Sequence, residues 1–131
     1  MAQGNPVVHF EMPYEDLDRV SAFYREAFGW GMQPTGPDMG DYILAATAET
    51  GADGRPTAPG TINGGFYPRR PDAPAHPSVV IAVADIEAAA RGVADGGGEV
   101  LGDPIEIPGI GRYVSFHDPE GNRVSLLQPS T

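Results

Sequence analysis

His9 and Glu11 are a pair of residues whose types and spacing could do chemistry. They stand two positions apart in the segment VVHFEM, which is apolar and β-branched and is bounded by Pro6 and Pro13. Such a segment predicts a strand, and residues two apart lie on the same face of a strand. A neighbouring carboxylate would orient the imidazole and raise its pKa, so the pair is a candidate general base. The alternative is a half-buried histidine that is bonded to the backbone.

The composition excludes several other kinds of site. The chain has 131 residues, no cysteine and a formal net charge of −10, which rules out disulfides, thiolate metal sites and cysteine nucleophiles. Strong acidity disfavours nucleic acid as a partner and favours cationic small molecules. The sequence has neither a signal-peptide pattern nor an apolar run of the roughly 20 residues that a membrane span requires. We therefore expect a cytoplasmic protein that binds neither nucleic acid nor a membrane.

The first half of the chain predicts a strand, a helix and three more strands. Apolar residues recur at helical spacing between Asp16, a plausible N-cap, and Gly29, a plausible stop. The residues expected to be buried along this helix are Leu17, Val20, Phe23 or Tyr24, and Ala27. The predicted strands cover residues 7–12, 30–33, 42–47 and 61–67. In the last of these, Gly64 and Gly65 suggest a bulge or the close approach of a ligand or another backbone.

The second half repeats this pattern after a proline-rich linker at residues 68–77. A strand at 78–83 precedes a helix that starts at Asp85, and short strands follow at 99–101, 104–107, 112–116 and 123–128. His9 aligns with Ser78, and Asp16 aligns with Asp85. We therefore predict an α+β fold in one domain over residues 1–131: two tandem βαβββ modules, about 6–67 and about 78–128, forming a curved mixed sheet around a cleft.

The run HFEMPYEDLDRVSAFYREAFGW resembles the first-module signature of the vicinal oxygen chelate superfamily, which includes glyoxalase I, the bleomycin-resistance proteins and the extradiol dioxygenases. The run DPEGNRVSLLQ is similar to the last hairpin of the same superfamily. The resemblance covers nearly the whole chain and implies the two-module fold. It does not specify an activity, because the superfamily hosts lyases, epimerases, dioxygenases, thiol transferases and drug-sequestering proteins.

The resemblance also implies where a metal would bind in the metal-dependent members. His9 matches the ligand position of the first strand, whereas Asn63, Ser78 and Ser125 fall where the family usually has Glu, His and Glu. The internal repeat supports this alignment because it pairs Asn63 with Ser125. Neutral amides and hydroxyls are weak ligands for Zn, Ni or Fe, so we expect no metal site and no cofactor. His76 could partly substitute for Ser78, but the prolines around it argue that it lies outside the cup.

Three classes of function remain open. The first is a module that binds a small cationic or aromatic molecule without a metal, with ligand-binding residues at His9, Trp30, Asn63, Ser78, Tyr113 and Ser125. The second is a glyoxalase-related lyase or isomerase that uses His9 with Glu11 as catalytic residues. The third is a non-catalytic accessory protein with a vestigial pocket. We also expect a homodimer, because superfamily members commonly cover an open sheet edge with a second copy.

Overall fold

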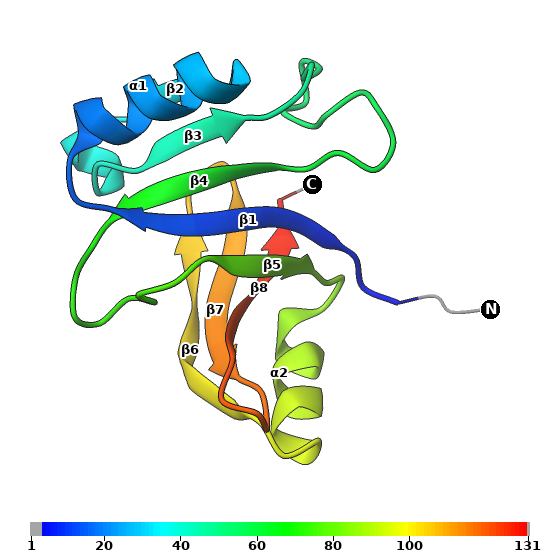
Figure 1. Cartoon of the computed structure of the whole chain (residues 1–131). Helices are drawn as coiled ribbons and strands as arrows, with labels where there is room; N and C mark the ends of the chain where they lie inside the picture. Colours follow the sequence, from blue (N-terminus) through cyan, green and yellow to red (C-terminus); the bar gives the residue numbers. More distant parts are fainter. Residues whose placement is uncertain (1–3, 131) are drawn as a thin grey trace. The chain divides into compact units, whose positions relative to one another are not determined.

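The computed structural model describes residues 4–130 and divides into two compact units (Figure 1). One unit is His9–Pro77, which we call the first module. The other combines the described residues up to Val8 with those from Ser78 onward, and we call it the second module. Along the chain each half runs strand, helix and three strands. The α+β class and the repeated βαβββ pattern predicted from the sequence are therefore confirmed.

The first half of the chain forms a mixed arrangement of four strands with one long helix. Its strands are ordered β2-β3-β4-β1, and β1 runs parallel to β4 while the other neighbours are antiparallel. A short 3-10 helix, Pro37–Met39, was not expected. The main elements are β1 (Val7–Tyr14), α1 (Leu17–Phe28), β2 (Gly31–Pro34), β3 (Ile43–Ala46) and β4 (Asn63–Pro68).

Helix α1 begins and ends where the sequence predicts. The Asp16 carboxylate accepts a hydrogen bond from the backbone N–H of Arg19 at 2.9 Å, and Gly29 closes the helix with a left-handed φ of 71°. The predicted buried stripe is wrong in part, because Phe23 and Ala27 are exposed and Ser21 is buried instead. Successive helical residues are rotated by about 100°, which turns Phe23 away from the sheet and brings Ser21 onto it.

One face of β1 packs against the apolar core, and the other face carries polar side chains. The buried core of the first module consists of Tyr14, Met32, Ile43, Ala45 and Phe66. Phe10 and Met12 pack against this core from β1. Because side chains alternate along a strand, His9 and Glu11 lie on the opposite face, as predicted.

The second half of the chain repeats this plan with strand order β5-β8-β7-β6. Strands β5 and β8 are parallel, and the remaining pairs are antiparallel. The two short strands expected at 99–101 and 104–107 form one strand, with a register shift between Leu101 and Ile105. The elements are β5 (Ser78–Ala82), α2 (Ile86–Asp95), β6 (Glu99–Ile107), β7 (Gly111–His117) and β8 (Arg123–Pro129).

Local signals in the second half also have their expected roles. Asp85 caps α2 by accepting from the backbone N–H of Ala88 at 3.1 Å. The Asp118 carboxylate accepts from the backbone N–H groups of Glu120 and Asn122, each at 2.9 Å, in the turn between β7 and β8. The antiparallel pairing of β7 with β8 across this turn confirms the expected hairpin. Among residues 4–130, no helix is long and apolar enough to cross a membrane.

Candidate functional site

A chain of hydrogen bonds joins three polar side chains of the first module. The Tyr42 hydroxyl lies 3.0 Å from Nε2 of His9 and donates to Oε2 of Glu11 at 3.1 Å. His9 and Glu11 come from one face of β1, and Tyr42 immediately precedes β3. Strand β4 lies between these two strands, so the tyrosine must reach across β4 to meet them. We call these residues the His9–Tyr42–Glu11 chain.

Gly65 on β4 provides the room for this crossing. It is the strand partner of both Glu11 on β1 and Leu44 on β3. A Cβ atom built on Gly65 would overlap the hydroxyl and the ring of Tyr42. The close approach expected at the two glycines is therefore made by side chains, since Phe10 covers Gly64 in the same way.

Burial sets the protonation state of His9. It lowers the pKa of the imidazole from the ordinary 6.5 to about 4, because an ion loses hydration when it is buried. The expectation that Glu11 raises this pKa is wrong. Its carboxylate meets the imidazole through the Tyr42 hydroxyl, and the loss of hydration dominates. His9 is therefore neutral at pH 7.

Asn63 does not join the His9–Tyr42–Glu11 chain, although it lies opposite His9 in the strand register. Its Oδ1 accepts from the backbone N–H of Thr47 and its Nδ2 donates to Oγ1 of Thr50, both at 2.9 Å. Both ends of the amide therefore hold the segment after β3. Ser78 opens β5, and its buried hydroxyl has no hydrogen-bond partner within residues 4–130.

The second module has a polar cluster made of hydroxyl groups alone. Ser125 on β8 lies 2.7 Å from the Tyr113 hydroxyl and 2.9 Å from the Ser115 hydroxyl, both on β7. Ser125 is 2% exposed. The structure thus brings together two of the predicted ligand-binding residues, Tyr113 and Ser125, and adds Ser115. We call these residues the hydroxyl cluster.

Strand register corrects the repeat alignment of Asn63 with Ser125. In the first half His9 pairs with Asn63 and Glu11 pairs with Gly65. In the second half Ser125 pairs with Val80, which lies two residues after Ser78. With His9 equivalent to Ser78, the counterpart of Ser125 is Gly65. The alignment was wrong by two residues, a slip that keeps every side chain on its expected face.

Tyr42 is the residue of this site that the sequence reasoning missed. Its counterpart is Tyr113, because Gly65 pairs with Leu44 and Ser125 pairs with Ser115. In each half, a tyrosine stands two residues before that strand partner. The runs YIL and YVS in the sequence carried this signal. The corrected register was needed to recognise it.

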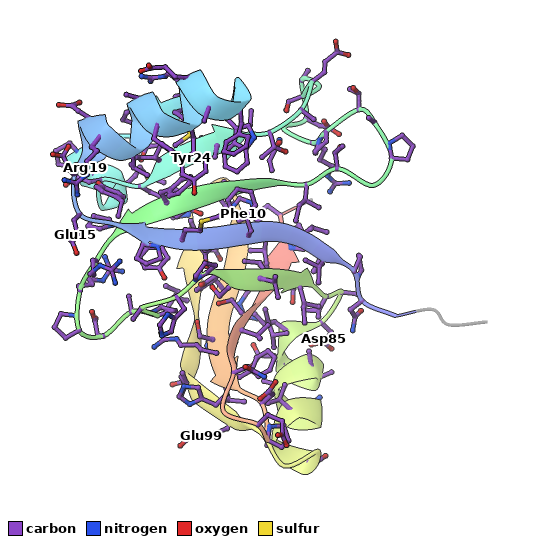
Figure 2. The ribbon with its side chains drawn as sticks, viewed as in Figure 1. Phe10, Glu15, Arg19, Tyr24, Asp85 and Glu99 are labelled. Carbon is purple, nitrogen blue, oxygen red and sulfur yellow. The ribbon has the colours of Figure 1, made fainter. Side chains whose placement is uncertain are left out.

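Trp30 packs against α1 and lies away from His9. Its ring stacks on Tyr24 at 4.6 Å and 14°, and its centre is 5.5 Å from the ring of Phe10. Phe10 and Tyr24, labelled in Figure 2, approach each other from β1 and α1. This is the core side of β1. Trp30 thus packs away from the face that carries His9 and Glu11.

A separate hollow of about 460 Å³ opens at the start of α1. Glu15 and Arg19, labelled in Figure 2, line it, and Glu15 forms an ion pair with Arg69 at 3.2 Å. None of the predicted site residues lines it. Its lining is Pro13, Tyr14, Glu15, Asp16, Arg19, Val20, Phe23 and Arg69.

The side chains at the family's ligand positions do not fit a divalent metal. Across residues 4–130, no three His, Cys, Asp or Glu side chains gather closely enough to hold one. The register moves the position expected at Asn63 to Gly65, which has no side chain. The Asn63 amide is bonded at both ends, and Ser125 belongs to the hydroxyl cluster. Amides and hydroxyls are neutral donors that hold zinc, nickel or iron weakly.

Comparison with known proteins shows which family this chain resembles. The model of the Glyoxalase/Bleomycin resistance protein/Dioxygenase superfamily matches residues 7–126. The anthracycline biosynthesis protein DnrV of Streptomyces peucetius is 31% identical over 92% of this chain and 45% of its own length. A glyoxylase-like domain-containing protein of Didymella fabae is 34% identical over 86% of this chain and 84% of its own. The putative glyoxylase CFP32 of Mycobacterium bovis is 38% identical over 53% of this chain. The chain spans about a quarter of the length of CFP32 and under half that of DnrV.

Solved structures share the fold at low sequence identity. A variant of Streptomyces coelicolor methylmalonyl-CoA epimerase matches with a TM-score of 0.70 and 20% identity, over 97% of this chain and 99% of its own. The Mycobacterium tuberculosis enzyme of the same name matches with a TM-score of 0.69 and 18% identity, over 100% of this chain and 93% of its own.

Proposed function

Since the chain belongs to the Glyoxalase/Bleomycin resistance protein/Dioxygenase superfamily, we propose that it binds a small organic molecule at the His9–Tyr42–Glu11 chain without a divalent metal. The observation that carries this proposal is the position of Tyr42. Its hydroxyl occupies the space above Gly65 and bonds both His9 and Glu11. A neutral imidazole, a hydroxyl and a carboxylate form a polar set that binds organic groups by hydrogen bonds.

Charge and relatives indicate the kind of molecule. The net charge of −10 attracts cations over long range and repels anions. Two relatives, DnrV and the Streptomyces DauV, are named for anthracycline biosynthesis, which supports an aromatic ligand. We therefore propose a cationic or aromatic small molecule.

A lyase or isomerase that uses His9 with Glu11 is the second candidate. The same hydrogen-bond chain favours it, because an imidazole and a carboxylate joined by a hydroxyl can pass a proton between them. Such an enzyme would take a proton from its substrate at His9. It would need no group from outside the chain for that step.

The test starts with the metal content of the purified, untagged protein by elemental analysis. Calorimetric titrations with Ni, Zn, Mn and Fe(II) follow, and then a screen of cationic and aromatic compounds. We expect no stoichiometric metal and a bound compound whose affinity falls at least about tenfold, or 1.4 kcal/mol, in His9→Ala. His76→Ala, at an exposed histidine outside the site, is the matched control and should bind normally. Stoichiometric metal binding that His9→Ala abolishes would overturn the proposal.

A further inference from the structure

We propose that Tyr42 is a positioning residue that holds His9 in the tautomer with its proton on Nε2, and that Nδ1 is the acceptor for a ligand group that donates a hydrogen bond. Such a group is a protonated amine, an amide N–H or a hydroxyl. The tautomer follows from this chain's own contacts. The ligand class rests on the proposed function, because it assumes that the ligand meets His9.

The first step counts the protons along the hydrogen bonds. A carboxylate has no proton to give, so the 3.1 Å bond between Glu11 and Tyr42 uses the tyrosine's single hydroxyl proton. The Tyr42 oxygen then has only lone pairs left for His9. The 3.0 Å contact with Nε2 therefore needs a proton on that nitrogen.

The opposite tautomer would break this chain. A bare Nε2 would take the only Tyr42 proton, and the lone pairs of Tyr42 and Glu11 would then face each other at 3.1 Å. Two acceptors left without a proton between them in a part-buried site cost the free energy of an unmade hydrogen bond. The Nε2–H tautomer satisfies both contacts, and the opposite one satisfies a single contact.

The second step concerns the other ring nitrogen. Burial lowers the pKa of His9 to about 4, so the ring carries one proton at pH 7. With that proton on Nε2, Nδ1 has a free lone pair. Within residues 4–130, the structure gives Nδ1 no hydrogen-bond partner. The half-buried imidazole thus keeps one acceptor for a molecule from outside.

The third step gives the class of ligand group. A lone pair accepts N–H and O–H donors and repels the oxygens of a carboxylate or phosphate. The Glu11 carboxylate, two residues along the same strand face, adds a negative charge that favours a protonated amine. The group that meets His9 is therefore a donor, whichever molecule carries it.

The tautomer is tested by nitrogen NMR on the full chain labelled with 15N, at pH 7. His9 is assigned by the signals that disappear in His9→Gln, since His76 and His117 remain. We expect a protonated Nε2 and an unprotonated Nδ1 for His9. In Tyr42→Phe, which keeps the ring and removes the hydroxyl, we expect a mixture of both tautomers. A proton on Nδ1 in the unaltered chain would overturn the assignment, and so would an unchanged tautomer in Tyr42→Phe.

The ligand class is tested with matched probes in the same NMR experiment. Benzylamine, benzyl alcohol and benzoate share one ring and differ in the group they present. We expect the amine and the alcohol to shift the Nδ1 signal of His9 at millimolar concentration, and benzoate to leave it in place. An equal shift by benzoate, or no shift by any probe, would overturn the ligand class. The tautomer is decided separately by the unliganded spectra, and the metal-free function by the metal titrations.

Discussion

The two modules place different polar chemistry at equivalent positions of one repeated pattern. The first has an imidazole and a carboxylate joined by the Tyr42 hydroxyl. The second has the hydroxyl cluster, in which Tyr113, the counterpart of Tyr42, bonds Ser125. One difference between them lies on the last strand of each half, where the first module has Gly65 and the second has Ser125. The others lie on the first strand, where His9 and Glu11 correspond to Ser78 and Val80.

The position of Gly65 and Ser125 decides how far each tyrosine reaches. In the second module the Ser125 side chain fills the position and bonds the tyrosine from the neighbouring strand. In the first module the absence of a side chain lets Tyr42 cross Gly65 and bond residues on the strand beyond. Gly65 thus lets Tyr42 reach His9 and Glu11, the titratable residues that stand where the second module has Ser78 and Val80.

Among the variants that test this comparison, Gly65→Ala should lower the free energy of unfolding the most. The added methyl group would overlap the Tyr42 ring and force it off His9 and Glu11. Overpacking together with two lost hydrogen bonds should lower the free energy of unfolding by about 4 kcal/mol. Chemical denaturation measures this loss, and the His9 tautomer should also become mixed.

Two further variants control this prediction. Gly92→Ala adds a methyl group on α2 that, beyond the backbone of its own helix, has no atom of the described chain within 4 Å, so it should be neutral or stabilising by up to about 1 kcal/mol. Tyr42→Ala combined with Gly65→Ala should cost less than the sum of the two single changes, because the overlap is relieved. Additive losses would show that Tyr42 does not occupy the space above Gly65.

The features of the fold and of the site that depend on local sequence pattern could be predicted from the sequence. The faces of β1 follow from alternation, and the caps of α1 and α2 follow from residue type at a fixed distance. The tyrosine contact could not be predicted, because it depends on which residues of separate strands pair. A slip of two residues preserves alternation, so the sequence pattern did not distinguish Asn63 from Gly65 as the counterpart of Ser125. The stacking of Trp30 on Tyr24 likewise depends on a contact between residues of different elements.

His9 in the first module should make the free energy of unfolding depend on pH. The unfolded chain takes up a proton on His9 near its ordinary pKa of 6.5, whereas the folded chain resists this until about pH 4. The unfolded state binds more protons in that window, so stability falls as pH drops from 6.5 to 4. The His9 contribution should be on the order of 3 kcal/mol across the window.

His9→Gln isolates this contribution. Urea denaturation at pH 7, 6, 5 and 4 should show a flatter slope for this variant than for the unaltered chain. His76→Gln, at an exposed position, leaves His9 in place and should keep the original slope. Equal slopes in His9→Gln and the unaltered chain would mean that the first module does not resist protonation at His9.

Variants of the hydroxyl cluster should have the smallest effects, and effects of a different kind; the first of them is Ser125→Ala. It removes the hydroxyl that bonds both Tyr113 and Ser115, so it should lower the free energy of unfolding by about 2 kcal/mol. Ser115→Ala breaks one of these bonds and should cost about half as much. Serine hydroxyls do not ionise between pH 4 and 7, so both variants should shift the pH–stability curve uniformly and leave its slope unchanged. A loss that grew toward pH 4 would show that the hydroxyl cluster is coupled to a titrating group, and the contrast between the modules would not hold.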